Sequence, residues 1–271
     1  MATFRMGFVC KGDVESVKMV RYLVEKFESR AEIFVEPKTA RKLGVEETAV
    51  EEMDVDLIVS VGGDGTILKA IRTMADPLPI LGINMGTLGF LVDVVPQEAV
   101  KTLEHVLFGF DVEERSRLEM RLNGKPLPPA TNEVALITSR PAKMLEFDIN
   151  VNDFFLERLR ADGLLFATST GSTAYAMSAG GPIVDPGVDA VVLVPLAPFK
   201  LSARPWVLPG DSEIRVSLIL PNKTALVVID GRNTVTISEK DRITIRKAKT
   251  PARFVKTREG IFYEKVMSKL A

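Results

Sequence analysis

The pattern of apolar and polar residues divides the chain into two parts of different character. In residues 1–109, short apolar runs such as Leu57–Val61 alternate with segments such as Val14–Glu28, in which apolar residues recur at helical spacing. The runs predict buried strands, and the spaced residues predict surface helices. Strands that alternate with helices indicate a doubly wound α/β domain, in which helices cover both faces of a parallel sheet. Further strands are expected at Phe4–Cys10, Glu32–Val35 and Pro79–Ile83, and further helices at Ile67–Met74 and Gln97–Phe108.

From residue 110 to residue 255 the pattern changes to short strands separated by turns, which predicts a β-sandwich domain. Residues 213–218 alternate between polar and apolar, as a half-buried antiparallel strand does. The basic run Arg242–Arg258 is interpreted as a solvated strand face, and residues 256–271, with a helical pattern, are expected to pack back on the first domain. Strands are expected at Arg117–Leu122, Glu133–Thr138, Leu145–Val151, Phe154–Arg160, Val191–Pro195, Glu213–Leu220, Ala225–Asp230, Thr234–Ser238 and Arg242–Arg246.

Composition and charge exclude several classes of function. The 271 residues are 46% hydrophobic and 26% charged, which excludes a disordered chain. The balance of 35 Lys and Arg against 36 Asp and Glu offers no general attraction to nucleic acid or to an anionic membrane, so neither is expected as a partner. One Cys and one His are too few for a zinc cluster, and the lone Cys10 favours a cytoplasmic setting.

The first candidate for chemistry is the glycine-rich segment Gly62–Thr66, which follows the predicted strand Leu57–Val61. Glycines let backbone N–H groups approach a ligand closely, and the start of a helix, with Thr66 as its expected N-cap, attracts an anion. The segment lacks the Lys of a Walker A loop and the third Gly of a dinucleotide fingerprint. A carboxylate among phosphates is explained if Asp64 contacts a metal or an acceptor hydroxyl. The alternative is a plain strand-to-helix turn with Asp64 exposed.

Three further segments carry polar groups suited to a nucleotide. A second glycine-rich turn, Gly82–Phe90, follows the next strand, so both turns are expected at the carboxyl edge of the sheet, where ligands bind. Residues 168–178 contain seven hydroxyls, which suit a ribose or a phosphate. Asn132 can bond an adenine edge, and Glu133 can accept from ribose hydroxyls. Taken singly, each segment also has a purely structural interpretation: a tight turn, a hydroxyl-rich loop and a polar strand end, respectively.

Taken together and in this order, the segments resemble the NAD kinase family. The resemblance rests on Gly62–Thr66, Gly82–Leu91, Thr131–Glu133, Asp162–Gly163 and Thr170–Tyr175, and it extends from about Phe4 to the C-terminal helix. The Gly-Gly-Asp-Gly element alone is also similar to diacylglycerol kinases, sphingosine kinases and phosphofructokinases. The Asn-Glu and Thr-Gly-Ser-Thr-Ala-Tyr elements narrow the resemblance to NAD kinases. It implies an α/β domain, a β-sandwich domain and a C-terminal segment that returns to the first.

The resemblance also implies a reaction and a set of site residues. A phosphoryl group of ATP, or of polyphosphate, would pass with a divalent metal, expected to be magnesium, to the 2′-hydroxyl of the adenosine ribose of NAD. Asp64 would be the proton acceptor. NAD would be bound by Asp64, Gly65, Asn132, Glu133, Lys143, Arg160, Asp162, Thr173, Ala174, Tyr175, Ala176, Met177 and Ser178. The phosphates of ATP would be held by Gly62, Gly63, Gly65, Thr66 and Lys69.

Two positions depart from the family pattern, and some alternatives stay open. Ser169 stands where the family commonly has Pro, and Arg232, a possible substrate contact, stands where Gln is frequent. As in the family's dimers and tetramers, some contacts are expected across a subunit interface. The competing functions are a lipid or sugar kinase that shares the Gly-Gly-Asp-Gly element, and a non-catalytic module that binds NADP. The residues leave open the phosphoryl donor, the acceptance of NADH and the metal ligands.

Overall fold

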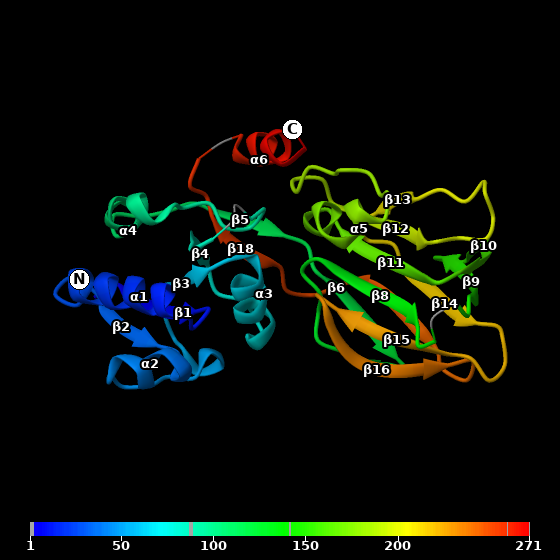
Figure 1. Ribbon diagram of the computed structural model, residues 1–271, viewed down its shortest axis with the longest axis horizontal. Coiled ribbons are helices and arrows are strands. Elements are labelled where there is room, and N and C mark those ends of the chain that lie inside the picture. Colours follow the sequence, from blue (N-terminus) through cyan, green and yellow to red (C-terminus); the bar gives the residue numbers. More distant parts are fainter. Residues whose placement is uncertain (1–2, 87–88, 141, 259, 271) are drawn as a thin grey trace. The chain divides into compact units, whose positions relative to one another are not determined.

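The computed structural model describes residues 3–86, 89–140, 142–258 and 260–270, which form two compact units (Figure 1). The α/β unit comprises Met1–Glu114 and Ala252–Ala271, and the sandwich unit comprises Arg115–Pro251. The expected boundaries at residues 109 and 255 differ from these because two strands near the boundaries, β5 (Val112–Arg115) and β18 (Ala252–Val255), join the sheet of the α/β unit. Among the described residues, no helix is long and apolar enough to cross a membrane.

The α/β unit is built on one sheet with the strand order β2-β1-β3-β4-β18-β5, in which the neighbours from β2 to β18 run parallel. Its other strands are β1 (Arg5–Cys10), β2 (Glu32–Val35), β3 (Leu57–Gly62) and β4 (Ile80–Asn84). Its helices are α1 (Val14–Phe27), α2 (Pro37–Leu43), α3 (Asp64–Thr73), α4 (Ala99–Val106) and α6 (Ile261–Leu270), with short 3-10 turns at Val50–Glu52 and Pro96–Glu98.

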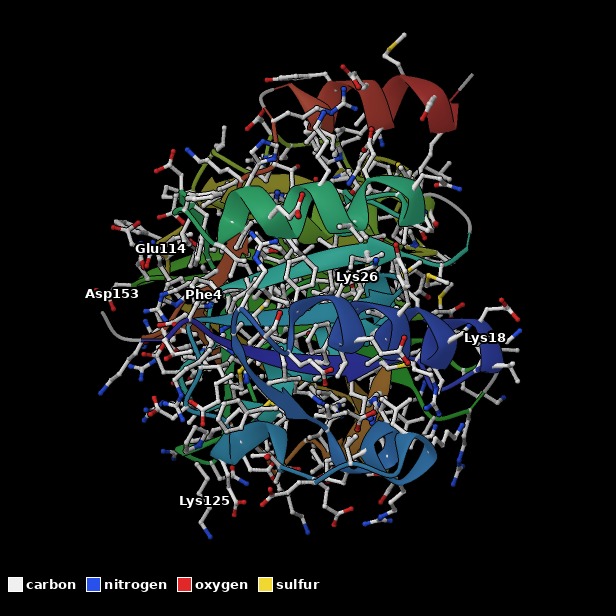
Figure 2. All side chains as sticks on the ribbon, turned by 90° about the vertical axis from the view of Figure 1, so that its left-hand side faces the viewer. Phe4, Lys18, Lys26, Glu114, Lys125 and Asp153 are labelled. Atoms are coloured by element: carbon white, nitrogen blue, oxygen red, sulfur yellow. The ribbon has the colours of Figure 1, made fainter. Side chains whose placement is uncertain are left out.

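Helices cover both faces of this sheet because successive side chains of its strands enter different apolar clusters. Phe8 of β1 packs in the cluster that contains residues of α1 and α4, and its neighbour Val9 packs in the cluster that contains residues of α3. The helices are amphipathic, as their spacing predicts. On α1, Leu23 is fully buried, whereas Lys18 and Lys26 project to solvent (Figure 2). The predicted doubly wound fold is therefore confirmed.

The sandwich unit consists of two six-stranded antiparallel sheets, with the strand orders β10-β9-β14-β17-β6-β7 and β13-β12-β11-β8-β15-β16. Phe147 of one sheet and Phe166 of the other are fully buried in a single apolar cluster, which confirms the predicted sandwich. The strands are β6 (Leu118–Leu122), β7 (Lys125–Pro126), β8 (Glu133–Thr138), β9 (Leu145–Val151), β10 (Phe154–Ala161), β11 (Gly163–Thr168), β12 (Ala190–Leu196), β13 (Trp206–Pro209), β14 (Ile214–Leu218), β15 (Thr224–Ile229), β16 (Arg232–Ser238) and β17 (Ile243–Lys247).

The structure corrects several expected elements. α3 begins at Asp64, because Gly63 and not Thr66 is its N-cap. Residues 252–255, which are interpreted above as a solvated face, form the inner strand β18, in which Ala252 and Phe254 are buried. The sequence analysis does not predict α2, α5 (Tyr175–Ser178), β5, β7, β11 or β13. The tail does return to the α/β unit, since β18 lies beside β4 and α6 belongs to the same unit.

Candidate active site

The first glycine-rich turn places Asp64 where it can hold the second one. Asp64 is the first residue of α3, directly after the N-cap Gly63. Its carboxylate accepts hydrogen bonds from three consecutive backbone N–H groups, those of Phe90 at 2.7 Å, Leu91 at 3.0 Å and Val92 at 3.2 Å. A side chain at Gly89 would overlap this carboxylate, so the sequence Gly-Phe permits the close approach. The two turns therefore form one hydrogen-bonded unit.

This arrangement corrects the interpretation of Asp64 as an exposed side chain in a plain turn, whereas its expected role toward a metal or an acceptor hydroxyl stays a prediction. The side chain is not exposed in a plain turn, and its charge already has partners without a metal or a substrate hydroxyl. Gly62 and Thr66 lie side by side, since a side chain at Gly62 would overlap the Thr66 hydroxyl. Gly65 and Lys69 are exposed on α3. Thr87 and Leu88 of the second turn lie outside the described residues.

In the sandwich unit a second carboxylate, Asp230, holds the Asn-Glu segment in the same way. Asp230 lies in the turn between β15 and β16 with a φ of 45°. Its carboxylate accepts from the backbone N–H groups of Thr131 at 2.9 Å, Asn132 at 2.8 Å and Glu133 at 3.1 Å. The sequence analysis does not propose Asp230 as a site residue. The Asp-Gly pair is a tight-turn signal that could have drawn attention to it.

Glu133 is the most perturbed acidic group of this site. It is 6% exposed, and its Oε2 atom has no hydrogen-bond partner among the residues that the structure describes. Burial raises the pKa of Glu133 to about 7, and the neighbouring Asp230 carboxylate adds to the rise, while the backbone N–H of Tyr175 acts in the opposite direction. Buried polar atoms are normally paired, so this oxygen is suited to accept from a ligand donor.

The hydroxyl-rich segment differs from its expected role because most of its hydroxyls hold the loop together. Thr168 Oγ1 donates to the backbone oxygen of Thr131 at 2.7 Å, and Ser172 Oγ bonds both the backbone N–H and the oxygen of Val184. A side chain at Gly171 would overlap the backbone of Asn132. Residues Thr170–Thr173 form a 3-10 turn, followed by Ala174 and then by the short helix α5 (Tyr175–Ser178). Within this helix Ala176 is fully buried and Tyr175 is 43% exposed.

The predicted NAD-binding residues of the sandwich unit fall into two groups at opposite ends of the same strands. Glu133 is the first residue of β8 and pairs with Ala167 near the end of β11, so it lies beside the segment 168–178. Asp162 lies at the other end, where its backbone oxygen accepts from Thr138 N–H at 2.8 Å. A six-residue strand spans about 17–20 Å, so a single chain does not bring Asp162 and its neighbour Arg160 beside Glu133. The guanidinium of Arg160 lies 5.1 Å from the ring centre of Phe199.

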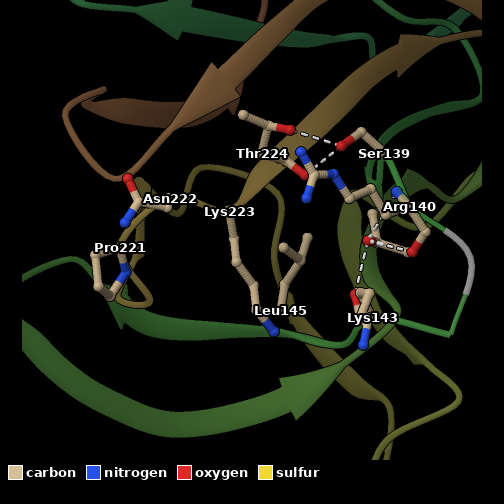
Figure 3. Close-up of a pocket in the computed structure, with 9 residues that line it drawn as sticks. Ser139, Arg140, Lys143, Leu145, Pro221, Asn222, Lys223 and Thr224 are labelled. Carbon is tan, nitrogen blue, oxygen red and sulfur yellow. Dashed lines mark hydrogen bonds between the residues drawn. The ribbon is translucent and has the colours of Figure 1, made fainter.

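Lys143, from the same end as Asp162, lines a basic pocket of about 180 Å³ (Figure 3). Arg140 and Lys223 line it as well, and none of its lining residues is acidic. The Lys223 ammonium donates to the backbone oxygen of Met144 at 2.5 Å. Among the described residues, the lining consists of Thr138, Ser139, Arg140, Lys143, Leu145, Pro221, Asn222, Lys223 and Thr224. Arg232 lies elsewhere, exposed at the start of β16 next to the Asp230 turn.

Comparison with known proteins identifies the family. The model of the ATP-NAD kinase N-terminal domain matches residues 7–109, and that of the ATP-NAD kinase C-terminal domain matches residues 131–257. The NAD kinase of Methanosarcina mazei is 53% identical over 275 residues, covering 100% of this chain and 95% of that protein. The chain belongs to the NAD kinase family. The NAD kinase of Methanothermobacter thermautotrophicus is also similar, with 46% identity over 98% of this chain and 96% of that protein.

Solved structures of NAD kinase relatives share the fold. Yeast NADH kinase, complexed with NADH, has a TM-score of 0.90 at 25% identity and covers 100% of this chain and 88% of its own. An NAD kinase from Archaeoglobus fulgidus in complex with ATP has a TM-score of 0.82 at 32% identity, with 98% of both chains covered. The NAD kinase resemblance is confirmed. The lipid or sugar kinase is set aside because both family models and the curated relatives are NAD kinases, and the non-catalytic module is set aside because NAD kinases are phosphotransferases.

Proposed function

We propose that this chain transfers the γ-phosphoryl group of ATP, or a phosphoryl group of polyphosphate, to the 2′-hydroxyl of the adenosine ribose of NAD. The observation that most supports a dinucleotide at this site is the buried Glu133 oxygen without a partner among the described residues. A ribose hydroxyl would donate to it and relieve a cost of about 1–3 kcal/mol for an unpaired buried group. Asn132, whose backbone Asp230 holds, would bond the adenine edge.

The segment after β11 would complete the binding of the dinucleotide. Because its hydroxyls are mostly used internally, its contribution would come from backbone groups of residues 173–178 and from the ring of Tyr175. This ring is 43% exposed, so one of its faces could stack on a base or on the nicotinamide. The internal hydrogen bonds keep these groups in place before the ligand binds, which lowers the entropic cost of binding.

Asp64 would align the acceptor hydroxyl, while the start of α3 would hold phosphates. Oδ2 of Asp64 accepts one loop N–H and Oδ1 accepts two, so Oδ2 retains a lone pair for the 2′-hydroxyl. Phosphoryl transfer depends mostly on positioning and charge stabilisation, so an oriented carboxylate contributes even before it takes a proton. Gly63, Gly65 and the exposed Lys69 would lie near the phosphates of ATP.

Magnesium is the divalent ion that suits this donor set. Among the described residues, no group of three His, Cys, Asp or Glu side chains could hold a metal by itself. Magnesium keeps several waters and binds substrate phosphates, so it needs few protein ligands. Three backbone N–H groups and the acceptor hydroxyl would occupy Asp64, so phosphates and water would supply the ligands of the ion. When bound, the ion would neutralise charge on the phosphates, and Lys69 would act in the same direction.

We further propose a homodimer or homotetramer in which one subunit completes the site of another. This assembly is supported by a separation within one chain: Asp162, Arg160 and the basic Lys143 pocket lie at the opposite end of the strands from Glu133. The pocket would then receive an anionic part of the dinucleotide. Exposed apolar side chains on the outer strand β13 and in the segment before it offer a surface for pairing: Phe199, Leu201, Trp206 and Val207. The free, buried Cys10 is compatible with the proposed cytoplasmic setting.

The test is the formation of NADP by the purified full-length chain. It is incubated with NAD, magnesium and either ATP or polyphosphate, and NADP is detected with an NADP-specific dehydrogenase; NADH is offered in parallel as acceptor. Glu133→Gln should raise the KM for NAD about tenfold without changing the KM for ATP. Glu119→Gln is the matched control, since Glu119 is a carboxylate of the same unit held by Arg121 and Arg246. Absence of NADP with both donors would overturn the proposal.

A further inference from the structure

The segment that Asp64 holds, residues 90–93, is also held from its other side by the C-terminal helix. The ammonium of Lys265 on α6 donates to the backbone oxygens of Phe90 at 3.0 Å and Val92 at 2.8 Å, and to the Asp93 carboxylate. Asp64 takes the N–H groups of the same stretch. The backbone N–H groups of residues 90–92 thus donate to the Asp64 carboxylate, while the backbone oxygens of Phe90 and Val92 accept from the Lys265 ammonium.

Lys265 is an unusual residue for this position. It is 3% exposed, and its three hydrogen bonds use all the donors of an ammonium group. Burying a charged side chain costs free energy that an apolar side chain of similar volume would not, so a buried ion pair is a poor means of attaching a helix. What the ammonium supplies, and an apolar side chain does not, is a fixed direction for two peptide carbonyls.

We propose that Lys265 is a positioning residue for Asp64. By holding the carbonyl oxygen of Phe90, it fixes the peptide plane that carries the N–H of Leu91, which bonds the Asp64 carboxylate, and by holding the carbonyl oxygen of Val92 it anchors the end of the same segment. The ammonium thereby sets the direction in which the carboxylate faces the acceptor hydroxyl. The inference rests on the proposed role of Asp64 in phosphoryl transfer. It makes the C-terminal helix part of the catalytic apparatus of the α/β unit.

The test compares Lys265→Met with a control on the same helix. Met preserves the volume and removes the three donors, so kcat should fall by up to ~10²-fold, the cost of a small displacement of a reacting group, while the KM for NAD changes less than about twofold. Lys269→Met is the control, because Lys269 contacts the ring of Phe90 at 4.3 Å and none of these carbonyls. Its kcat should stay within about twofold of the parent.

A double-mutant cycle separates positioning from simple attachment of the helix. If Lys265 acts through Asp64, the Lys265→Met/Asp64→Asn variant should be no slower than Asp64→Asn alone. Multiplying losses would overturn the inference. So would an unchanged kcat in a folded Lys265→Met variant when Asp64→Asn is slow. An Asp64→Asn variant of normal turnover would instead refute the proposed role of Asp64 itself.

A second variant tests whether a loss of activity comes from a folding defect. Met at 265 leaves the Asp93 carboxylate without its cation, so Lys265→Met/Asp93→Asn removes both charges together. This variant should fold, with a circular dichroism spectrum like that of the parent, and should show the same loss of kcat. If both variants fail to fold, Lys265 is an attachment residue and the positioning role is wrong.

Discussion

Two carboxylates of this chain each hold three consecutive backbone N–H groups, Asp64 in the α/β unit and Asp230 in the sandwich unit. Asp64 lies at the start of a helix and holds the loop Phe90–Val92, whereas Asp230 lies in a hairpin turn and holds Thr131–Glu133. The same local chemistry thus occurs on two unrelated architectures. A carboxylate suits this task because its two oxygens can accept several hydrogen bonds at once.

The two sites differ in what holds the carbonyl side of the bound segment. In the α/β unit it is the Lys265 ammonium. In the sandwich unit it is Thr168, which donates from its backbone N–H to Asn132 and from its hydroxyl to Thr131. At the first site, a half-buried anion and a buried cation bond opposite sides of the same segment. At the second site, burial raises the pKa of Glu133, and the neighbouring Asp230 carboxylate adds to the rise.

This difference indicates different tasks for the two carboxylates. Asp64 is itself the group proposed to face the reacting hydroxyl, so its own orientation is what the surrounding loop controls. Asp230 presents other residues, Asn132 and Glu133, that are proposed to bind the adenosine. Changes at the first site should therefore lower kcat, and changes at the second should raise the KM for NAD.

The largest effect is expected for Asp64→Asn, with kcat lower by ~10²–10⁴-fold, the range for loss of a general base. The KM for NAD should change little. An Asn side chain has one acceptor oxygen, so at least one N–H of the loop also loses its partner. Steady-state kinetics with separate titration of NAD, ATP and magnesium provides the measurement. Asp56→Asn serves as control, because Asp56 also accepts a backbone N–H, that of Arg5, at the surface of the same unit.

The raised pKa of Glu133 predicts a pH dependence of stability. Burial holds this pKa at about 7 against an ordinary value of 4.5, so the folded chain binds the proton more tightly than the unfolded chain. The stabilisation is complete below about pH 4.5 and is lost as the pH rises through about 7. At 1.36 kcal/mol per pKa unit the loss approaches ~3 kcal/mol. Chemical denaturation across this range should show the slope, and Glu133→Gln should abolish it; an unchanged slope would contradict the account.

Asp230→Asn should weaken NAD binding and leave kcat within a few-fold. At least one of the N–H groups of Thr131–Glu133 loses its acceptor, at a cost of about 1–3 kcal/mol, which corresponds to roughly a 5- to 160-fold rise in the KM for NAD. The control is Asp241→Asn, since Asp241 accepts the backbone N–H of Ser238 in another turn of the same unit. A fall in kcat with an unchanged KM would remove the distinction between the two carboxylates.

The smallest effect is expected for Tyr175→Ala, which removes the exposed ring but none of the carboxylate contacts. Stacking on an aromatic ring contributes ~1–3 kcal/mol, and the lower end applies here because the ring is only half exposed. Its loss should therefore raise the KM for NAD about fivefold. Tyr175→Phe keeps the ring and should bind NAD like the parent. Equal KM values for the Ala and Phe variants would rule out stacking.

The sequence predicted the fold where the apolar pattern was strong. β2, β8 and β9 have the predicted bounds, and the glycine-rich turns and the Asn-Glu segment were identified as candidate sites. The apolar pattern was weak in short elements that mix apolar and charged residues. β18 begins and ends among Lys and Arg, and its burial follows from its place between β4 and β5, which only the folded sheet determines.

The partners of the two carboxylates could not be predicted from residue types. Asp64 bonds the backbone of residues 26 to 28 positions away, and Asp230 bonds backbone 97 to 99 positions away. Every residue except proline offers such an N–H group, so no side-chain pattern marks the contact. Lys265 was missed for the same reason, because two of its three partners are backbone oxygens. Several hydroxyls of residues 168–178 bond the loop itself, which residue types could not reveal, because a hydroxyl that holds a loop and one that binds a ligand look the same in the sequence.

The most direct test of the two-carboxylate account is a side-by-side steady-state measurement of kcat and of the KM for NAD on Asp64→Asn and Asp230→Asn. Both variants are first shown by circular dichroism to be folded, and NADP formation is followed at saturating ATP and magnesium. The account predicts opposite outcomes: a fall in kcat with a nearly constant KM for Asp64→Asn, and a rise in KM with a nearly constant kcat for Asp230→Asn. Near-normal turnover in folded Asp64→Asn, or the same kinetic change in both variants, would contradict it.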